Sequence, residues 1–213
     1  GTVGIGLIFA VLVDRIKREA LAKAIIFMPM AISFVGAGVI WKFVYNYGTS
    51  QVQTGILNAI ITGLGFEPVA WLSKVPLNTF MLIVVGIWMW TGFCMTLLSS
   101  AIKSIPEEII EASRIDGATN FEIFSKIQVP IIAPTIIVVI TTMVINVLKL
   151  FDIVYVMTGG NFGTNVIATR MYTEMYTNAQ YGRGTAIAVI LILFIIPFIV
   201  MNIRRFTKQE AMR

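Results

Sequence analysis

A polar stretch lies between two long apolar runs of this chain and limits what the chain can fold into. It runs from Ser104 to Pro130 and reads SIPEEIIEASRIDGATNFEIFSKIQVP. Ser104 with Glu107, and Thr119 with Glu122, have the spacing of a capping box, in which two side chains satisfy backbone N–H groups at a helix start. The stretch therefore predicts two short helices.

Glycine and proline mark where these two helices should end. Gly117 stands where the first helix stops, because glycine adopts the left-handed conformation without a Cβ penalty. Pro130 lacks a backbone N–H, so we expect it to close the second helix. The pattern predicts a helix, a sharp glycine turn and a helix on the water side of a membrane, which is the form of a docking element.

The composition indicates an integral membrane protein. The 213 residues are 57% hydrophobic and only 13% charged, whereas a soluble domain carries about 25% charged residues. The apolar residues also come in long runs, as in membrane-spanning helices. We expect an all-α, polytopic membrane helical bundle that forms a single transmembrane domain over residues 1–213.

Residue types that are rare in this chain exclude several kinds of chemistry. The chain has no histidine, which is the usual general base and a common metal ligand. Its one cysteine, Cys94, lies in an apolar run, so a disulfide or a cysteine-based zinc site within the chain is excluded. No paired nucleophile and base remain, and we predict no catalytic residue and no metal site.

Five apolar segments are candidate spans. As a helix, the first would be about 20 Å long, short of the ~30 Å hydrocarbon core, so we interpret it as the end of a longer helix and the sequence as a fragment without its N-terminal part. The segment Gly55–Leu64 is predicted to be an interfacial helix, and Thr158–Gly184 a polar loop. The candidate spans are Gly1–Val13, Ala24–Tyr45, Leu77–Ala101, Pro134–Met157 and Thr185–Ile203.

The lysines and arginines predict the orientation. Eleven of them fall on the side of the polar stretch and the C-terminal tail, against three or four on the other side. Positive loops remain in the cytoplasm, so residues 104–130 and the C-terminus are predicted to be cytoplasmic. The net charge of +5 is explained by these loops, and we expect a lipid bilayer and no nucleic acid as partner.

The polar stretch resembles the EAA motif of ABC importer permeases. Glu111–Ala118 reads EASRIDGA, and Ile127 and Pro130 follow at the motif's spacing; Ser113 and Val129 are mild departures from it. The resemblance implies that residues 104–130 form a cytoplasmic loop that couples to a separate ATPase subunit. The coupling residues it implies are Glu111, Ala112, Asp116, Gly117, Ala118, Ile127 and Pro130.

A second segment narrows the resemblance. Phe151–Gly160 reads FDIVYVMTGG and is similar to carbohydrate importers, in particular to the maltose "F" type of permease subunit and to α-glucoside permeases. This implies sugar import in the bacterial inner membrane, with a second permease subunit forming a heterodimer, two ATPase subunits and an extracytoplasmic sugar-binding protein. The chain has no Walker A sequence, so it holds no cofactor itself, and ATP with Mg²⁺ is expected on the partner ATPase.

The spans on either side of the coupling loop are predicted to line the substrate path. Trp90 and Phe93 offer aromatic faces for a sugar ring, and Trp90 is chosen over Trp88, which lies on another face of the helix. On the second span, Asn146, Lys149 and Asp152 recur three residues apart and should face the bundle interior. Lys149 and Asp152 either contact substrate or neutralise each other. Residues expected to flank them are Met143, Val147 and Leu150.

Two other functions stay open at this point. An ion-coupled secondary transporter has similar spans and a buried lysine–aspartate pair, but it does not need the helix-turn-helix loop. An ABC permease for another solute has the loop but a different cargo. Sugar uptake that depends on the ATPase subunit rather than on an ion gradient would distinguish an ATP-driven importer from an ion-coupled secondary transporter.

Overall fold

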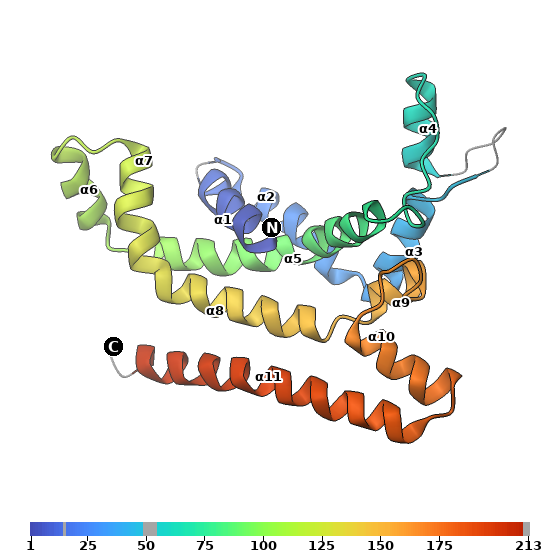
Figure 1. Cartoon of the computed structure of the whole chain (residues 1–213). Helices are drawn as coiled ribbons and strands as arrows, with labels where there is room; N and C mark the ends of the chain where they lie inside the picture. Colours follow the sequence, from blue (N-terminus) through green and yellow to red (C-terminus); the bar gives the residue numbers. More distant parts are fainter. Residues whose placement is uncertain (15, 49–54, 211–213) are drawn as a thin grey trace. The chain divides into compact units, whose positions relative to one another are not determined.

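The structure is a computed structural model that describes residues 1–14, 16–48 and 55–210, with side chains up to Arg204. It is helical, and none of the residues it describes lies in a strand (Figure 1). The chain forms two compact units. One comprises Gly1–Met28, Trp90–Ile145 and Phe198–Arg213, and the other comprises Pro29–Met89 and Asn146–Pro197.

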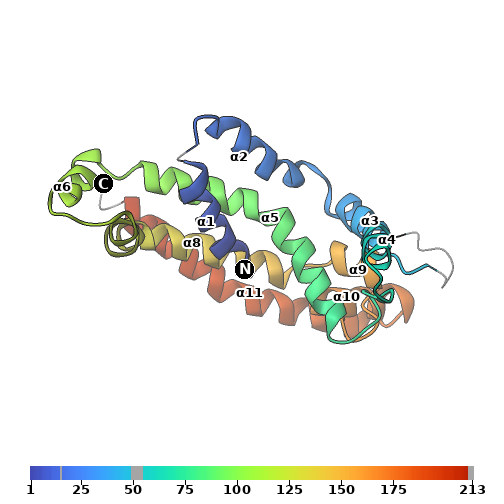
Figure 2. The ribbon, with the colours of Figure 1, turned by 90° about the horizontal axis from the view of Figure 1, so that it is seen from above.

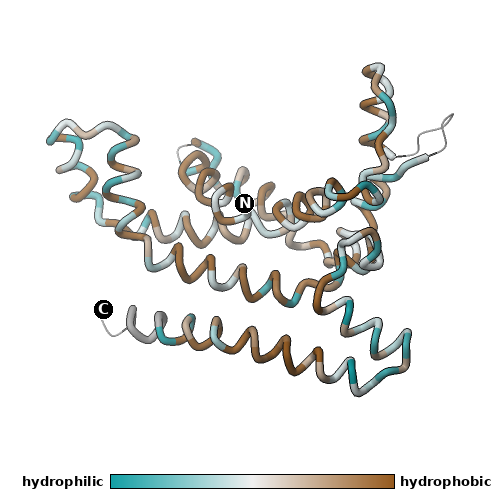
Figure 3. Tube along the Cα trace, in the orientation of Figure 1, coloured by the Kyte–Doolittle hydropathy of each residue, from teal (hydrophilic) through white to brown (hydrophobic). Residues whose placement is uncertain are grey.

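The spans are carried by the longest apolar helices. Three are long and apolar enough to cross a membrane: α5 (Leu77–Lys103), the continuous helix Asn120–Leu148, and Tyr181–Arg204 of α11 (Tyr181–Glu210). Their apolar character is visible as brown stretches of the tube in Figure 3. A fourth is possible if α2 (Glu19–Phe27) and α3 (Phe34–Val44) count as one interrupted span. The prediction of an all-α membrane bundle is confirmed.

The first unit is built around helix α1 (Thr2–Val13), which lies against the second half of α5 (Figure 2). Two glycines allow the helices there to approach closely. A Cβ on Gly6 would lie 2.7 Å from the Cβ of Cys94, and one on Gly92 would lie 2.5 Å from the carbonyl oxygen of Ile26 in α2. Small residues at helix crossings are the usual means of close packing in membranes. The buried core comprises Ala10, Val13, Cys94, Met95, Leu98, Val139 and Met143.

The second unit is built around α3, which packs against α9 (Asp152–Thr158). A Cβ on Gly38 of α3 would lie 3.1 Å from the side chain of Val156. Shorter elements complete this unit: η1 (Met28–Ala31), α4 (Ile56–Gly63), α10 (Ile167–Tyr172) and the π-helical turn η3 (Thr173–Thr177). The helix predicted over Gly55–Leu64 is thus confirmed as α4.

Three predicted segments differ from the observed helices. The segment Ala24–Tyr45 is interrupted: Pro29 lies in the turn η1, and Ser33 caps α3 by accepting the Gly36 N–H at 3.0 Å. The segment Thr158–Gly184 is not an irregular loop, because α10 and η3 lie in it. The segment Pro134–Met157 is not one helix, since α8 (Val129–Leu148) ends before α9 begins, and Pro134 lies inside α8.

Candidate coupling loop and substrate path

The polar stretch folds as a helix, a glycine turn and a second helix. Helix α6 (Glu107–Ile115) is capped by Asp116 and followed by Gly117, whose φ is +84°. The Ala118 N–H donates to the Ser113 carbonyl at 3.0 Å, and the Gly117 N–H donates to the Arg114 carbonyl at 3.1 Å. This pair of bonds is a Schellman motif, which satisfies the last carbonyls of a helix and needs a left-handed residue at this position. The prediction for Gly117 is confirmed.

One of the two predicted capping boxes forms. The Thr119 N–H donates to Glu122 at 3.0 Å and the Glu122 N–H donates to the Thr119 hydroxyl at 3.3 Å, at the start of α7 (Asn120–Glu122). The Ser104 box is wrong: Pro106 precedes α6, and the Ser104 hydroxyl donates back to the Ala101 carbonyl at 2.8 Å.

The prediction that Pro130 closes the second helix is also wrong. Helix α7 continues through the π-helical turn η2 (Ile123–Gln128) directly into α8, which contains Pro130. A π-helical turn interrupts the regular i→i−4 hydrogen bonds, so the missing N–H of Pro130 falls where that ladder is already interrupted. The second arm of the coupling loop is therefore the start of a membrane-spanning helix rather than a separate element.

The loop exposes apolar side chains next to acidic ones. Ile109 is 40% exposed, Ile115 86% and Phe121 75%. Glu111, Ala112, Asp116 and Pro130 are exposed as well, whereas Ala118 and Ile127 are half-buried. Figure 3 shows hydrophobic and hydrophilic residues alternating along α6. An exposed apolar patch with acidic neighbours is typical of a protein-binding surface.

An ionic cluster joins α1, α2 and α5 at the end of α5 that leads into the loop. Lys23 Nζ lies 2.7 Å from the Asp14 carboxylate and 2.6 Å from Glu19, and Lys103 also pairs with Glu19. The Ser99 hydroxyl donates to Asp14 at 2.7 Å. Because two cations and two anions share partners, the cluster ties the three helices together at the end of α5 that leads into the loop.

The aromatic residues of α5 fall into two groups. Trp90 and Phe93 form an edge-to-face pair with centroids 5.8 Å apart, and both pack against the core of the first unit. Trp88 contacts Trp41 of α3 instead, with centroids 5.4 Å apart. Trp88 and Trp90 therefore lie in different environments, in agreement with the choice of only one of them for the substrate path. That role itself stays a prediction.

The predicted polar row on the next span does not lie on one helix. Asn146 is half-buried in α8, but Lys149 is exposed in the break after Leu148, and Asp152 is the first residue of α9. Among the residues that the structure describes, no ion pair joins Lys149 to Asp152. The i+3 spacing fails because the helix ends between them. The flanking residues also differ: Met143 is buried, Leu150 is half-buried, and Val147 is 66% exposed.

Sequence reasoning missed a buried asparagine that organises the second unit. The side chain of Asn58 in α4 is fully buried and makes four hydrogen bonds of 2.9 to 3.0 Å. Its amide nitrogen donates to the carbonyls of Asn46 and Val69, and its oxygen accepts from the Val69 N–H and from Trp71 Nε1. A lone amide in an otherwise apolar helix was the signal that could have found it.

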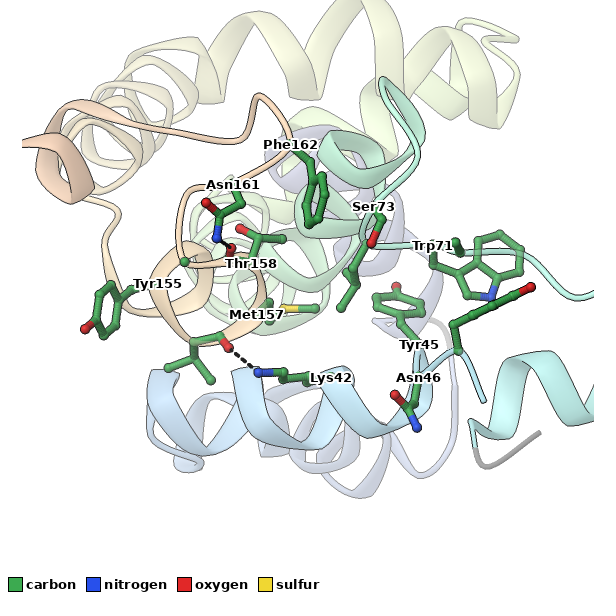
Figure 4. A pocket seen from close by; sticks show the side chains of 15 residues that line it. Lys42, Tyr45, Asn46, Trp71, Ser73, Tyr155, Met157, Thr158, Asn161 and Phe162 are labelled. Carbon is green, nitrogen blue, oxygen red and sulfur yellow. Dashed lines mark hydrogen bonds between the residues drawn. The ribbon is translucent and has the colours of Figure 1, made fainter. Parts of the chain in front are cut away.

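The same unit contains a cavity of about 720 Å³ that the sequence did not predict (Figure 4). It is lined by the end of α3, by the segment before α5 and by α9 with the turn that follows it. Within the described part of the chain, no group of three histidine, cysteine or acidic residues is placed to hold a metal ion.

Comparison with known proteins identifies the family. The family model described as the binding-protein-dependent transport system inner membrane component matches residues 2–209. The osmoprotective compounds uptake permease protein GgtC of Synechocystis is 59% identical over the whole chain, which covers 76% of that protein. The alpha-glucoside transport system permease protein AglF of Rhizobium meliloti is 51% identical over 97% of this chain and 62% of its own length.

A more distant relative and a solved structure agree with this. The trehalose/maltose transport system permease protein MalF of Thermococcus litoralis is 33% identical over 94% of this chain and 67% of that protein. A crystal structure of a bacterial ABC transporter involved in the import of alginate contains a chain with the same fold, with a TM-score of 0.80 and 22% identity over 94% of this chain and 72% of that chain. The chain therefore belongs to the family of binding-protein-dependent transport system inner membrane components.

Proposed function

We propose that this chain is the transmembrane permease subunit of an ATP-driven importer for a small sugar of the glucoside or oligosaccharide class. The observation that carries the proposal is the coupling loop: a Schellman turn at Gly117 presents an exposed face of α6 beside the start of a spanning helix. The names of the relatives, which include alpha-glucoside and trehalose/maltose permeases, support the substrate class.

Coupling follows from the shape and stiffness of the loop. A separate ATPase subunit binds the exposed face that contains Ile109, Ala112 and Ile115, while Glu111 and Asp116 accept hydrogen bonds from its basic or N–H groups. ATP with Mg²⁺ is bound and hydrolysed in that partner. Because α7 continues without a break into α8, movement of the bound ATPase is passed directly to a spanning helix.

The assembly we propose has a second permease subunit, two ATPase subunits and an extracytoplasmic binding protein. The alginate transporter has also been solved in complex with an alginate pentasaccharide-bound periplasmic protein, which supports a binding protein as partner here. The excess of lysine and arginine on the side of residues 104–130 supports a cytoplasmic coupling loop and C-terminus. Sugar then crosses between the spans, past Trp90 and Phe93 and past Asn146 at the end of α8.

Uptake in cells tests the function. Cells with and without the full-length protein are offered labelled trehalose, maltose and other α-glucosides, together with osmoprotective solutes, which the name of the Synechocystis relative suggests as a second class. We expect uptake of at least one sugar that needs this chain and the ATPase subunit. Uptake that persists without the ATPase subunit but stops when the ion gradient is collapsed would contradict the proposal.

A further inference from the structure

The cavity of about 720 Å³ in the second unit has walls from three chain segments. They are the end of α3 with Tyr45, the segment Ala70–Ser73, and Tyr155–Phe162 of α9 and its following turn. In Figure 4, Phe162 and Tyr45 lie between Asn161 on one side and Trp71 on the other. Its volume is in the range of pockets that bind small molecules.

Aromatic rings form much of this wall. Phe162 is 54% exposed and Tyr47 is 52% exposed. Tyr45 is buried and contacts Trp71 with ring centroids 6.5 Å apart, and Trp41 with centroids 5.2 Å apart. Of the rings that line the cavity, Tyr45 and Trp71 therefore contact each other, and Trp41, which does not line the cavity, packs against Tyr45.

Polar groups converge on the same cavity. The Lys42 ammonium donates one hydrogen bond, to the Val156 carbonyl at 3.3 Å, and an ammonium has three N–H groups. Asn161 donates to the Thr158 carbonyl at 2.9 Å, and its amide oxygen is an acceptor. Ser73 adds an exposed hydroxyl. A few polar groups placed among aromatic rings are typical of pockets that orient a ligand.

The backbone of the wall is strained at one position. Phe162 has φ +54°, which is rare for a bulky residue. Its carbonyl accepts a 2.7 Å hydrogen bond from Asn78, whose side chain is fully buried. Strained residues of this kind persist where surrounding structure holds them, and they cluster at ligand clamps.

The part of the wall that contains Trp71 is also held in place by hydrogen bonds. Trp71 is bound through its Nε1 to Asn58, which also bonds to both flanks of the loop at Asn46 and Val69. An alternative explanation for these aromatic residues is an aromatic belt at the membrane interface, in which the rings are spread around the helices and face lipid. Rings that meet around one cavity, together with amide, hydroxyl and ammonium groups, do not fit that explanation.

We propose that this cavity is an extracytoplasmic subsite that binds one hexosyl ring of the imported sugar before it enters the spans. Phe162 and Trp71 contact the C–H faces of the ring, and Asn161, Ser73 and Lys42 bond to its hydroxyls. The proposal rests on the proposed function of sugar import. It differs from the path between the spans, to which Trp90 and Asn146 were assigned.

Photo-crosslinking locates the subsite directly. The complete transporter in lipid nanodiscs, without the binding protein, is labelled with a trehalose and a maltose that carry a diazirine, and the labelled peptides are mapped by mass spectrometry. We expect labelling within residues 70–73 or 155–162 that unlabelled sugar competes away. Phe162→Ala should reduce this labelling at least tenfold, and Phe162→Leu, which keeps an apolar side chain but removes the ring, should reduce it similarly.

A matched variant and two further measurements separate the outcomes. Phe66→Ala removes an aromatic ring that is 69% exposed in the same compact unit but does not line the cavity, and it should label as the wild type does. Labelling that is unchanged in both Phe162 variants, or that excess sugar does not compete, overturns the subsite. If the Phe162 variants lose affinity for the binding protein but keep unchanged labelling, the sugar subsite is overturned and the cavity is instead a contact site for the binding protein. If wild-type cells take up no sugar, the proposed function itself fails.

Discussion

Replacing Gly117 by valine should uncouple ATP hydrolysis from transport. The φ of +84° at Gly117 is left-handed, and a Cβ added there meets no atom within 4 Å. The cost is therefore in the backbone alone, about 2 kcal/mol for an L-residue in this region, and valine is especially unsuited to it. Since each 1.4 kcal/mol is a factor of ten, the equilibrium constant for forming the correct turn falls roughly 30-fold.

The assay compares ATPase activity and sugar uptake in proteoliposomes that contain the complete transporter. We expect Gly117→Val to insert normally, to retain basal ATP hydrolysis by the ATPase subunits and to lose most sugar-stimulated hydrolysis and uptake. Gly117→Asn should keep most of both, because asparagine tolerates the left-handed conformation.

A second glycine provides a matched control. Gly65 has φ +86° and, like Gly117, open space where a Cβ would be, but it lies after α4 rather than in the coupling loop. Gly65→Val should therefore bear a similar backbone strain without loss of coupling. Normal uptake in Gly117→Val, or equal uncoupling in Gly65→Val, would refute the role of the turn.

Three further changes test the packing and the path. Asn58→Leu removes four hydrogen bonds, each worth about 1 kcal/mol, and should lower the thermal unfolding temperature of the purified transporter. As a control, Thr62→Val loses only hydrogen bonds within α4 and should lower that temperature far less. Gly92→Leu places a Cβ 2.5 Å from a carbonyl oxygen of α2 and should lower the stability of the transporter by roughly 1–3 kcal/mol, measured by the same thermal unfolding. Gly4→Leu should leave the stability unchanged, because no atom lies within 4 Å of a Cβ added there. Asn146→Ala should weaken uptake while co-purification with the ATPase subunit is unchanged, and lost co-purification would show that the residue faces elsewhere.

The parts of the coupling loop that depend on neighbours in the sequence were predictable. A left-handed glycine and a capping box are decided within four or five residues, so Gly117 and Thr119 with Glu122 were assigned correctly. The predicted ends at Ser104 and Pro130 failed, because each depends on how an adjoining spanning helix ends or begins. Ser104 is engaged by the last turn of α5, and Pro130 follows a π-helical turn.

The substrate path was less predictable, because the prediction for its polar residues assumed one uninterrupted helix. Periodicity places Asn146, Lys149 and Asp152 on a common face only if the helix continues. The break at Lys149 has no proline or glycine beside it, and the helix that follows it, α9, packs against α3. Hydropathy alone does not locate such a break, because the residues on both sides are apolar.

The sequence by itself determined the membrane class, the all-α fold and the glycine turn at Gly117, because long apolar runs and a left-handed glycine act locally and in one dimension. The family match confirmed the membrane class and the resemblance to importer permeases. Only the tertiary structure decided that Asn58 joins two loop segments to Trp71, and that Phe162 and Trp71 line one cavity. None of those residues are neighbours in the sequence, so their partners are chosen by packing and by the need to satisfy buried polar groups.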